Sequence, residues 1–250
     1  MKEKIHTIPV VEAFEMEDEC PFCALERQTD QRAIRYYAGP SASYMEPEVR
    51  GTTNRAGFCG DHMQKLYDYG NALGAALMLQ THCEDILMDL QKQMDNYEIP
   101  AKKTFFGRKK QENVTAYWLH LQQRVDSCVI CDRVQENMDR QYRVFFTLLG
   151  EPEFRGMVEN SKGFCVRHFS RLLMEAEQHL PQKYAKWFYD TAYHVMEENL
   201  SRVKKDLDWL IAKYDYRNAG ADWGNSRDAL QRMIQKLNGL YPADGPYRKD

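Results

Sequence analysis

The sequence contains the same arrangement of cysteine and histidine residues twice. In the first copy, a C-x-x-C pair at Cys20–Cys23 is followed by G-F-C-x-x-H at Gly57–His62. In the second copy, Cys128–Cys131 is followed by Gly163–His168. Each copy therefore offers three thiols and one imidazole, a common ligand set of structural zinc sites. The candidate metal ligands are Cys20, Cys23, Cys59, His62, Cys128, Cys131, Cys165 and His168.

The spacing of the ligands predicts two metal sites, and we expect two zinc ions per chain. The two pairs of a copy are 36 residues apart in the first and 34 in the second, measured from Cys23 to Cys59 and from Cys131 to Cys165. The simplest pairing is one site within each copy, although exchange of pairs between the copies stays open. Iron is also compatible with such sulfur-rich sites. Because the protein supplies all four ligands, the sites favour a structural role over a catalytic one.

The residues around the ligands indicate how each pair is presented. Both kinds of pair are predicted at or just before the start of a helix, where the helix dipole favours thiolates. Gly57 and Gly163 suit a bend of the backbone before each second pair. Phe58 and Phe164 suit an apolar cover over the sulfur atoms.

The hydrophobic pattern predicts an all-α fold. Apolar residues recur at steps of three and four, and no segment shows sustained alternation with a period of two. We expect two duplicated helical halves, each with a Cys3His metal site, plus a C-terminal helical tail. The expected boundaries are 1–100 for the first repeat, 101–112 for a basic linker, 113–214 for the second repeat, and 215–250 for a C-terminal loop and helix.

Three helices of this pattern are long or distinctive. One runs from His62 to about Tyr97, with a stripe that includes Leu73, either Ile86 or Leu87, Leu90 and Met94. Cys83 falls on this stripe, so we assign Cys83 to the core and His82 to the surface. The longest predicted helix runs from Pro181 to about Tyr214, and a last helix ends near Gly239.

Composition limits the classes of partner. An apolar fraction of 43% with a formal charge of −3 is typical of a soluble globular protein, and it argues against one that coats nucleic acid with its whole surface. The longest apolar run is too short for a bilayer, which needs about 20 residues. We therefore expect no membrane partner and a cytoplasmic location. Nucleic-acid binding stays open through one basic segment that contains Lys102, Lys103, Arg108, Lys109 and Lys110.

No catalytic constellation is apparent. The sequence has no phosphate-binding glycine loop, no G-x-S-x-G and no H-E-x-x-H. Cys20–Cys23 resembles the active-site motif of glutaredoxins, but the acidic stretch before it is not strand-like. We therefore favour a non-enzymatic zinc protein that binds a protein partner or associates with itself. The alternatives are a nucleic-acid-binding zinc protein and a thiol/zinc redox switch.

The twin units also carry a resemblance. Together with Lys213-Tyr214-Asp215-Tyr216-Arg217 and Trp223-Gly224 before the last helix, they resemble an uncharacterised bacterial domain-of-unknown-function family. The resemblance covers nearly the whole chain and implies a bacterial cytosolic setting. It implies no catalytic residue.

Overall fold

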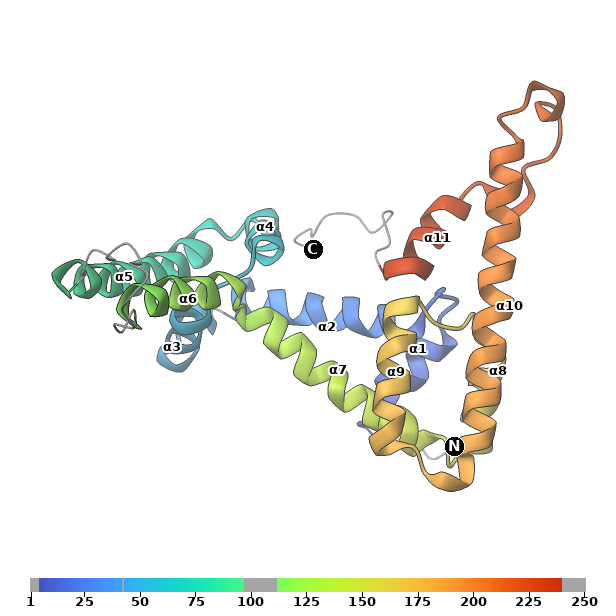
Figure 1. Ribbon diagram of the computed structural model, residues 1–250, viewed down its shortest axis with the longest axis horizontal. Helices are drawn as coiled ribbons and strands as arrows, with labels where there is room; N and C mark the ends of the chain where they lie inside the picture. Colours follow the sequence, from blue (N-terminus) through green and yellow to red (C-terminus); the bar gives the residue numbers. More distant parts are fainter. Residues whose placement is uncertain (1–4, 42, 97–111, 240–250) are drawn as a thin grey trace, which may run out of the picture. The chain divides into compact units, whose positions relative to one another are not determined.

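The computed structural model describes residues 5–41, 43–96 and 112–239, and these are built from α-helices and short 3-10 turns (Figure 1). No strand occurs among them, so the predicted all-α fold is confirmed. The basic segment with Lys102, Lys103, Arg108, Lys109 and Lys110 lies outside the described residues. None of the described helices has the length and apolar character needed to cross a membrane.

The order of helices repeats along the chain. In the first half, α2 (Pro21–Ala38) begins at a C-x-x-C pair, a short helix α3 (Pro47–Ala56) follows, and α4 (Gly60–Tyr69) begins at C-x-x-H. In the second half, α7 (Val129–Leu148), α8 (Pro152–Glu159) and α9 (Val166–His179) follow the same order. Both short helices begin with a proline at their first position, where the missing N–H is not needed.

The chain forms two compact units that do not coincide with the two halves of the sequence. Among the described residues, unit 1 contains 5–29 and 136–239, and unit 2 contains 30–96 and 112–135, apart from residue 42. The boundaries fall inside α2 and α7. Each unit therefore contains a segment from both halves. The boundaries expected at 101–112 and 214 stay predictions.

Unit 1 is built around aromatic side chains. The rings of Phe22 and Tyr142 stack with centroids 4.4 Å apart, and Phe14 stacks on Phe145 at 5.8 Å. Such pairs contribute about 0.5–1.5 kcal/mol beyond the burial of their area. Besides α8, α9 and parts of α2 and α7, the unit contains α1 (Ile8–Glu15), α10 (Ala185–Ala212) and α11 (Ala229–Asn238).

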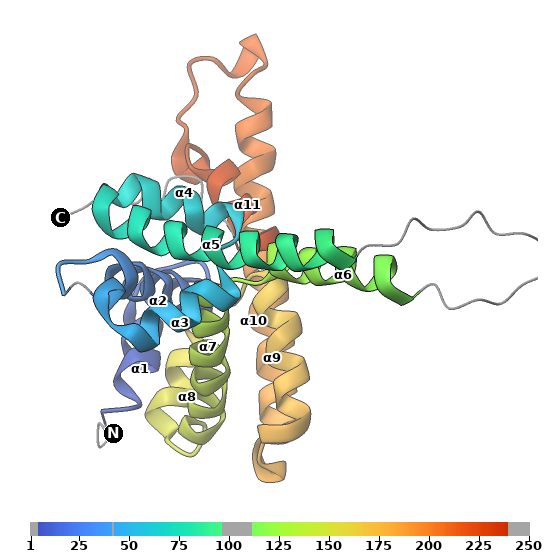
Figure 2. The same cartoon turned by 90° about the vertical axis from the view of Figure 1, so that its left-hand side faces the viewer.

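Unit 2 packs α3, α4, α5 (Ala72–Asn96) and α6 (Glu112–Asp126) with the remaining parts of α2 and α7. Its buried core includes Ile34, Phe58, Leu66, Met78 and Ile130. Both views show α5 and α6 side by side (Figures 1 and 2). The two helices are antiparallel, because their ion pairs and hydrogen bonds join Asp85 to Arg124 and Asp89 to His120.

The single helix predicted from His62 to Tyr97 is wrong, since two helices occupy this stretch. Gly70 ends α4 in the left-handed conformation with φ 81°. The side chain of Asn71 then accepts a hydrogen bond from Gly74 N at 3.1 Å and donates one to the carbonyl of Ala38 at 2.8 Å. A glycine in this conformation followed by an asparagine cap ends one helix and starts the next.

The predicted orientation of α5 is also wrong. His82 is buried and its Nδ1 lies 2.7 Å from the carbonyl oxygen of Asn54, whereas Cys83 is exposed. Leu73 and Met94, which belong to the predicted core stripe, are 66% and 72% exposed. α5 has two apolar faces, and periodicity alone does not show which face turns inward.

Candidate metal centres

The structure brings the eight cysteine and histidine residues together in two groups of four. Cluster 1 consists of Cys20, Cys23, Cys165 and His168, and cluster 2 consists of Cys59, His62, Cys128 and Cys131. In each cluster the ligand atoms all lie within 4.8 Å of one another. Cluster 1 lies within unit 1 and cluster 2 within unit 2. Both Cys3His groups could hold a metal ion.

The simplest pairing, one site within each sequence copy, is therefore wrong, because the ligand pairs are exchanged between the copies. The reason is the length of α2, which spans about 27 Å at 1.5 Å per residue. The returning chain meets α2 at Asp30, whose Oδ1 lies 2.7 Å from Nε2 of His62. This point is about 10 Å along the helix from Cys23. The Cys59–His62 pair therefore meets the C-x-x-C pair of the other copy.

Each ligand pair lies at the start of a helix, as predicted. Cys59 and Cys165 are the N-cap residues of α4 and α9, and Cys20 and Cys128 directly precede α2 and α7. Backbone N–H groups of the first turn point at sulfur: that of His168 lies 3.4 Å from Cys165 Sγ, and that of Cys131 lies 3.5 Å from Cys128 Sγ. Such donors stabilise the thiolate form that a metal binds.

The distances between ligand atoms match a tetrahedral zinc site. Zn–S and Zn–N bonds of about 2.3 and 2.0 Å place two sulfurs about 3.8 Å apart and a sulfur and a nitrogen about 3.5 Å apart. In cluster 1, Cys23 Sγ lies 3.6 Å from Cys165 Sγ, and the three sulfurs lie 3.3–3.5 Å from Nδ1 of His168. In cluster 2 the sulfur–sulfur distance from Cys59 to Cys131 is 3.7 Å, and the three sulfurs lie 3.2–3.3 Å from Nδ1 of His62.

Without a cation, the protonation of these groups is in conflict. One imidazole nitrogen forms a hydrogen bond with one thiol, yet three sulfurs surround it in each cluster. Burial raises the pKa of Cys20 to about 12. Burial also raises the pKa of Cys128, but hydrogen bonds from His62 and the backbone of Cys131 lower it to about 6. Three thiolates at this spacing need a positive charge among them, which a divalent ion supplies.

A carboxylate on α2 lies beside the second nitrogen of each imidazole. Asp30 contacts His62, and Lys65 Nζ lies 2.7 Å from the other carboxylate oxygen of Asp30. Burial lowers the pKa of His62, but hydrogen bonds to Asp30 and Cys128 raise it to about 10. In cluster 1, Glu26 Oε2 lies 3.6 Å from His168 Nε2 and also pairs with Arg167. Such partners orient metal-binding imidazoles.

The glycines of the two G-F-C segments bend the backbone as predicted, whereas the cover of the sulfur atoms by the two phenylalanines stays a prediction. Gly57 and Gly163 have φ values of 61° and 75°. A Cβ at Gly57 would lie 2.7 Å from the imidazole of His82, and one at Gly163 would lie 3.2 Å from Val195. Phe58 and Phe164 are both buried.

The two clusters differ in their exposure to solvent. All four residues of cluster 1 are buried, whereas in cluster 2 Cys131 is exposed and Cys59 is half-buried. Part of this difference comes from Gly239, the C-cap residue that follows α11, which lies over cluster 1: a Cβ there would be 3.4 Å from Cys165 Sγ.

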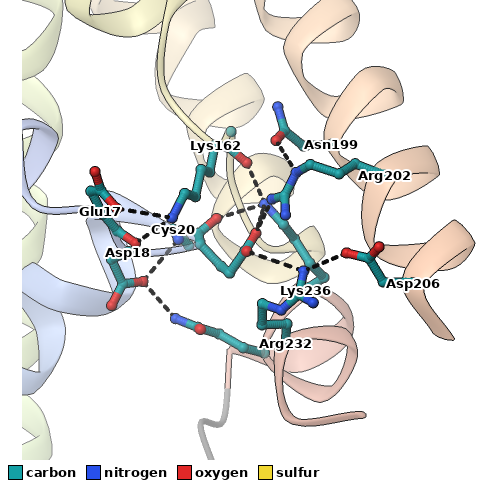
Figure 3. A network of polar contacts seen from close by, with 12 residues as sticks. Glu17, Asp18, Cys20, Lys162, Asn199, Arg202, Asp206, Arg232 and Lys236 are labelled. Carbon is teal, nitrogen blue, oxygen red and sulfur yellow. Dashed lines mark hydrogen bonds and ion pairs between the residues drawn. The ribbon is translucent and has the colours of Figure 1, made fainter. Parts of the chain in front are cut away.

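Lys236 of α11 joins the two segments that precede the ligand pairs of cluster 1 (Figure 3). Its side chain is fully buried. The ammonium group donates to the carbonyl of Glu19, which precedes Cys20, at 2.6 Å, and to the carbonyl of Lys162, which precedes Gly163. It also pairs with the carboxylate of Glu19 at 3.2 Å, and burial lowers the pKa of Lys236.

Other charged groups complete this network. Arg202 donates to Glu19 at 2.6 Å, and Arg232 pairs with Asp206 at 3.0 Å. Gln235 donates to Asp18, which itself accepts a hydrogen bond from Cys20 N at 2.9 Å. The sequence reasoning missed this network, because α11 turns its polar face inward while Leu230 and Leu237 are 55% and 57% exposed. The sequence does contain a sign of this network, because Lys236 and Arg232 lie one turn apart on the polar face of a strongly amphipathic helix.

The segment that follows α10 is shaped by Lys213. Its ammonium group donates to the carbonyls of Asn218 and Ala221, both at 2.6 Å, and lies 4.9 Å from the centroid of the Trp223 ring. Tyr214 and Tyr216 are both 86% exposed. The K-Y-D-Y-R segment therefore forms a turn around a lysine and contributes nothing to either cluster.

Comparison with known proteins identifies the family. The model described as "Family of unknown function (DUF6062)" matches residues 1–244, and the chain belongs to this family. It is similar to the "Uncharacterized 23.9 kDa protein in xynA 3'region" of Caldicellulosiruptor sp. (strain Rt8B.4), with 21% identity over 203 residues, which are 81% of this chain and 85% of that protein. No solved structure matches the chain significantly.

The turn before Cys165 predicts a specific effect of one methyl group. Gly163→Ala should lower the free energy of unfolding by about 1–3 kcal/mol, because an L-residue is strained at a φ of 75° and its Cβ would crowd Val195. Gly156→Ala is the matched control. Gly156 lies inside α8 with open space around its Cβ position, so alanine should raise the free energy of unfolding by about 0.5–1 kcal/mol. Urea unfolding of both variants measures the two changes, and equal effects would contradict the role of Gly163.

The contacts of Lys236 predict a large loss of stability on its removal. Lys236→Met keeps the length of the side chain but removes a donor from the carboxylate of Glu19 and from two backbone carbonyls. The free energy of unfolding should therefore fall by about 3–5 kcal/mol. Lys204→Met is the control, because the pair of Lys204 with Asp208 is exposed. Its effect should stay below about 1 kcal/mol. Denaturant unfolding of both variants distinguishes the two, and a small effect at Lys236 would show that its contacts are dispensable.

Proposed function

We propose that each cluster binds one zinc ion through all four of its side chains. We further propose that the two ions stabilise an all-helical protein that acts by binding other protein chains rather than by catalysis. The single observation that supports the metal most strongly is the set of sulfur–nitrogen distances, since three sulfurs lie 3.2–3.5 Å from one imidazole nitrogen in both clusters. Zinc is favoured because three thiolates and one imidazole in a tetrahedron are a common zinc set.

The donor set also supports a structural role for the ions. When all four ligands come from the protein, no position is left for water or substrate. The energy of ion binding then contributes to folding, since each ion joins segments that are far apart in the sequence. Cys23 and Cys165, for example, are 142 residues apart. Protein binding as the biological role rests on this closed shell and on the large apolar side chains exposed along α5.

Metal analysis tests this proposal. The purified protein should contain about two zinc ions per chain, measured by inductively coupled plasma mass spectrometry. Cys23→Ser should retain about one, because a cluster with three remaining ligands binds weakly. Cys83→Ser is the control, since Cys83 is exposed and belongs to neither cluster, and it should retain both. A strong chelator should lower the midpoint of thermal unfolding. Iron in place of zinc, or full stability without metal, would contradict the proposal.

A thiol/zinc redox switch at cluster 2 is a second candidate function. The observation that favours it is the exposure of Cys131, whose Sγ lies 3.7 Å from that of Cys59. Hydrogen peroxide would take two electrons from these two thiolates and, with two protons, give two molecules of water and a Cys59–Cys131 disulfide. The zinc ion would then lose two of its ligands and leave the protein.

The difference in burial predicts the order of zinc release. Under mild hydrogen peroxide, cluster 2 should lose its ion at least about tenfold faster than the buried cluster 1, because oxidation follows the access of the oxidant to thiolate. A chromogenic zinc indicator measures two phases of about equal amplitude. Cys131→Ser should remove the fast phase of zinc release. In the native protein, a reductant with added zinc should restore zinc binding at cluster 2 after the oxidation. A single phase for both ions would argue against a switch at cluster 2.

A further inference from the structure

One face of α5 forms a continuous apolar row. Seven uncharged residues on this face are all exposed, and we call them the α5 row: Ala72, Ala76, Leu79, Cys83, Leu87, Leu90 and Met94. From Ala72 to Met94 the row advances by 22 residue positions, which is six helical turns plus about 40°. It therefore runs nearly parallel to the helix axis for about 33 Å.

The opposite face of α5 already has its partners. Met78 and His82 are buried where α5 packs against α3, and Asp85 and Asp89 pair with Arg124 of α6. In the part of the chain that the structure describes, the α5 row stays exposed, with Leu87 at 51% and Met94 at 72%. Burial of such side chains against another apolar surface is favourable by about 25 cal/mol per Å². A large contiguous apolar surface of this kind is typical of a protein interface.

The spacing of the α5 row is symmetric about Cys83. Its members lie 4, 7 and 11 residues before Cys83 and 4, 7 and 11 residues after it. Two copies of α5 that pack antiparallel with Cys83 facing Cys83 therefore bring every member of one row opposite a member of the other. The same surface would serve on both chains, as the two-fold symmetry of a homodimer requires.

The sizes of the side chains are complementary in this arrangement. Ala72 would lie opposite Met94 of the second copy, Ala76 opposite Leu90, and Leu79 opposite Leu87. Small residues thus face large ones at both ends of the row, and leucines face each other nearer its centre, which fills the space evenly. A parallel pairing would place Ala72 and Ala76 opposite themselves at one end and Met94 opposite itself at the other. That pairing would leave a gap at one end of the row and crowd the other.

We propose that this protein forms a homodimer in which the α5 rows of two copies pack antiparallel across a two-fold axis at Cys83. This inference deepens the proposed interaction function, because it names a second copy of the chain as the partner. It does not depend on the identity of the metal. A monomeric protein with two zinc ions would contradict the dimer alone, whereas a dimer without zinc would contradict the metal proposal alone.

Light scattering and sedimentation of the full-length, zinc-loaded protein test the dimer. The mass should approach twice 29.4 kDa as the concentration rises. Leu87→Glu should weaken the dimer at least about tenfold, because it buries a charge one helical turn from the centre of the row. Leu230→Glu is the control, since Leu230 is 55% exposed on α11 and lies outside the row, and it should leave the dimer intact. A monomer at every concentration would overturn the proposal.

Cross-linking tests the direction of the two helices without relying on a disruptive variant. With the zinc sites saturated, a short bismaleimide should join two wild-type chains through Cys83, and Cys83→Ser should abolish the product. In the Cys83→Ser background, Ala76→Cys combined with Leu90→Cys should restore cross-linking, whereas each change alone should not. Residues 76 and 90 of one helix are about 21 Å apart, too far for a link within one chain. Cross-linking by Ala76→Cys alone would indicate parallel helices and overturn the proposed packing.

Discussion

The contact of three sulfur atoms with one imidazole nitrogen is the interaction on which each unit depends. In unit 1 it joins the start of α2 to the start of α9, and in unit 2 it joins the start of α7 to the start of α4. Several neighbouring residues support this contact: glycines with positive φ bend the backbone before the C-x-x-H pairs, the phenylalanines that follow them are buried, and a carboxylate on α2 lies against each imidazole. The helix starts supply N–H groups where negative charge gathers.

The two clusters have the same donor set but different surroundings. Cluster 1 is covered by α11, and its two ligand-bearing segments are joined by a lysine that donates to a backbone carbonyl of each. Cluster 2 has an exposed cysteine. The buried ammonium of Lys236 also interacts electrostatically with Cys20, and it would offset part of the negative charge of thiolates in cluster 1, since the interaction is strong where water is excluded. The same four ligands can therefore differ in reactivity within one chain.

Much of the fold could be predicted from the sequence, because helical periodicity and the positions of proline and glycine are local properties. The helix starts at the ligands and the bends at Gly57 and Gly163 followed from such local signals. The exchange of ligand pairs did not, since it depends on how far α2 carries the chain before it returns. The exposure of Cys83 and the inward face of Lys236 were missed for a related reason. An amphipathic pattern marks two faces of a helix, and its tertiary neighbours decide which of them is buried.

The exchange of ligand pairs makes each half of the sequence incomplete by itself. A half holds one C-x-x-C pair and one C-x-x-H pair, but its own long helix keeps them apart. Two identical halves would complete each other's clusters, because the C-x-x-H pair of each half would meet the C-x-x-C pair of the other and form two equal clusters. A short ancestral chain with this motif would therefore be an obligate swapped dimer. The present chain has the ligand pairing of such a dimer within a single polypeptide, because each of its halves supplies its C-x-x-H pair to the other.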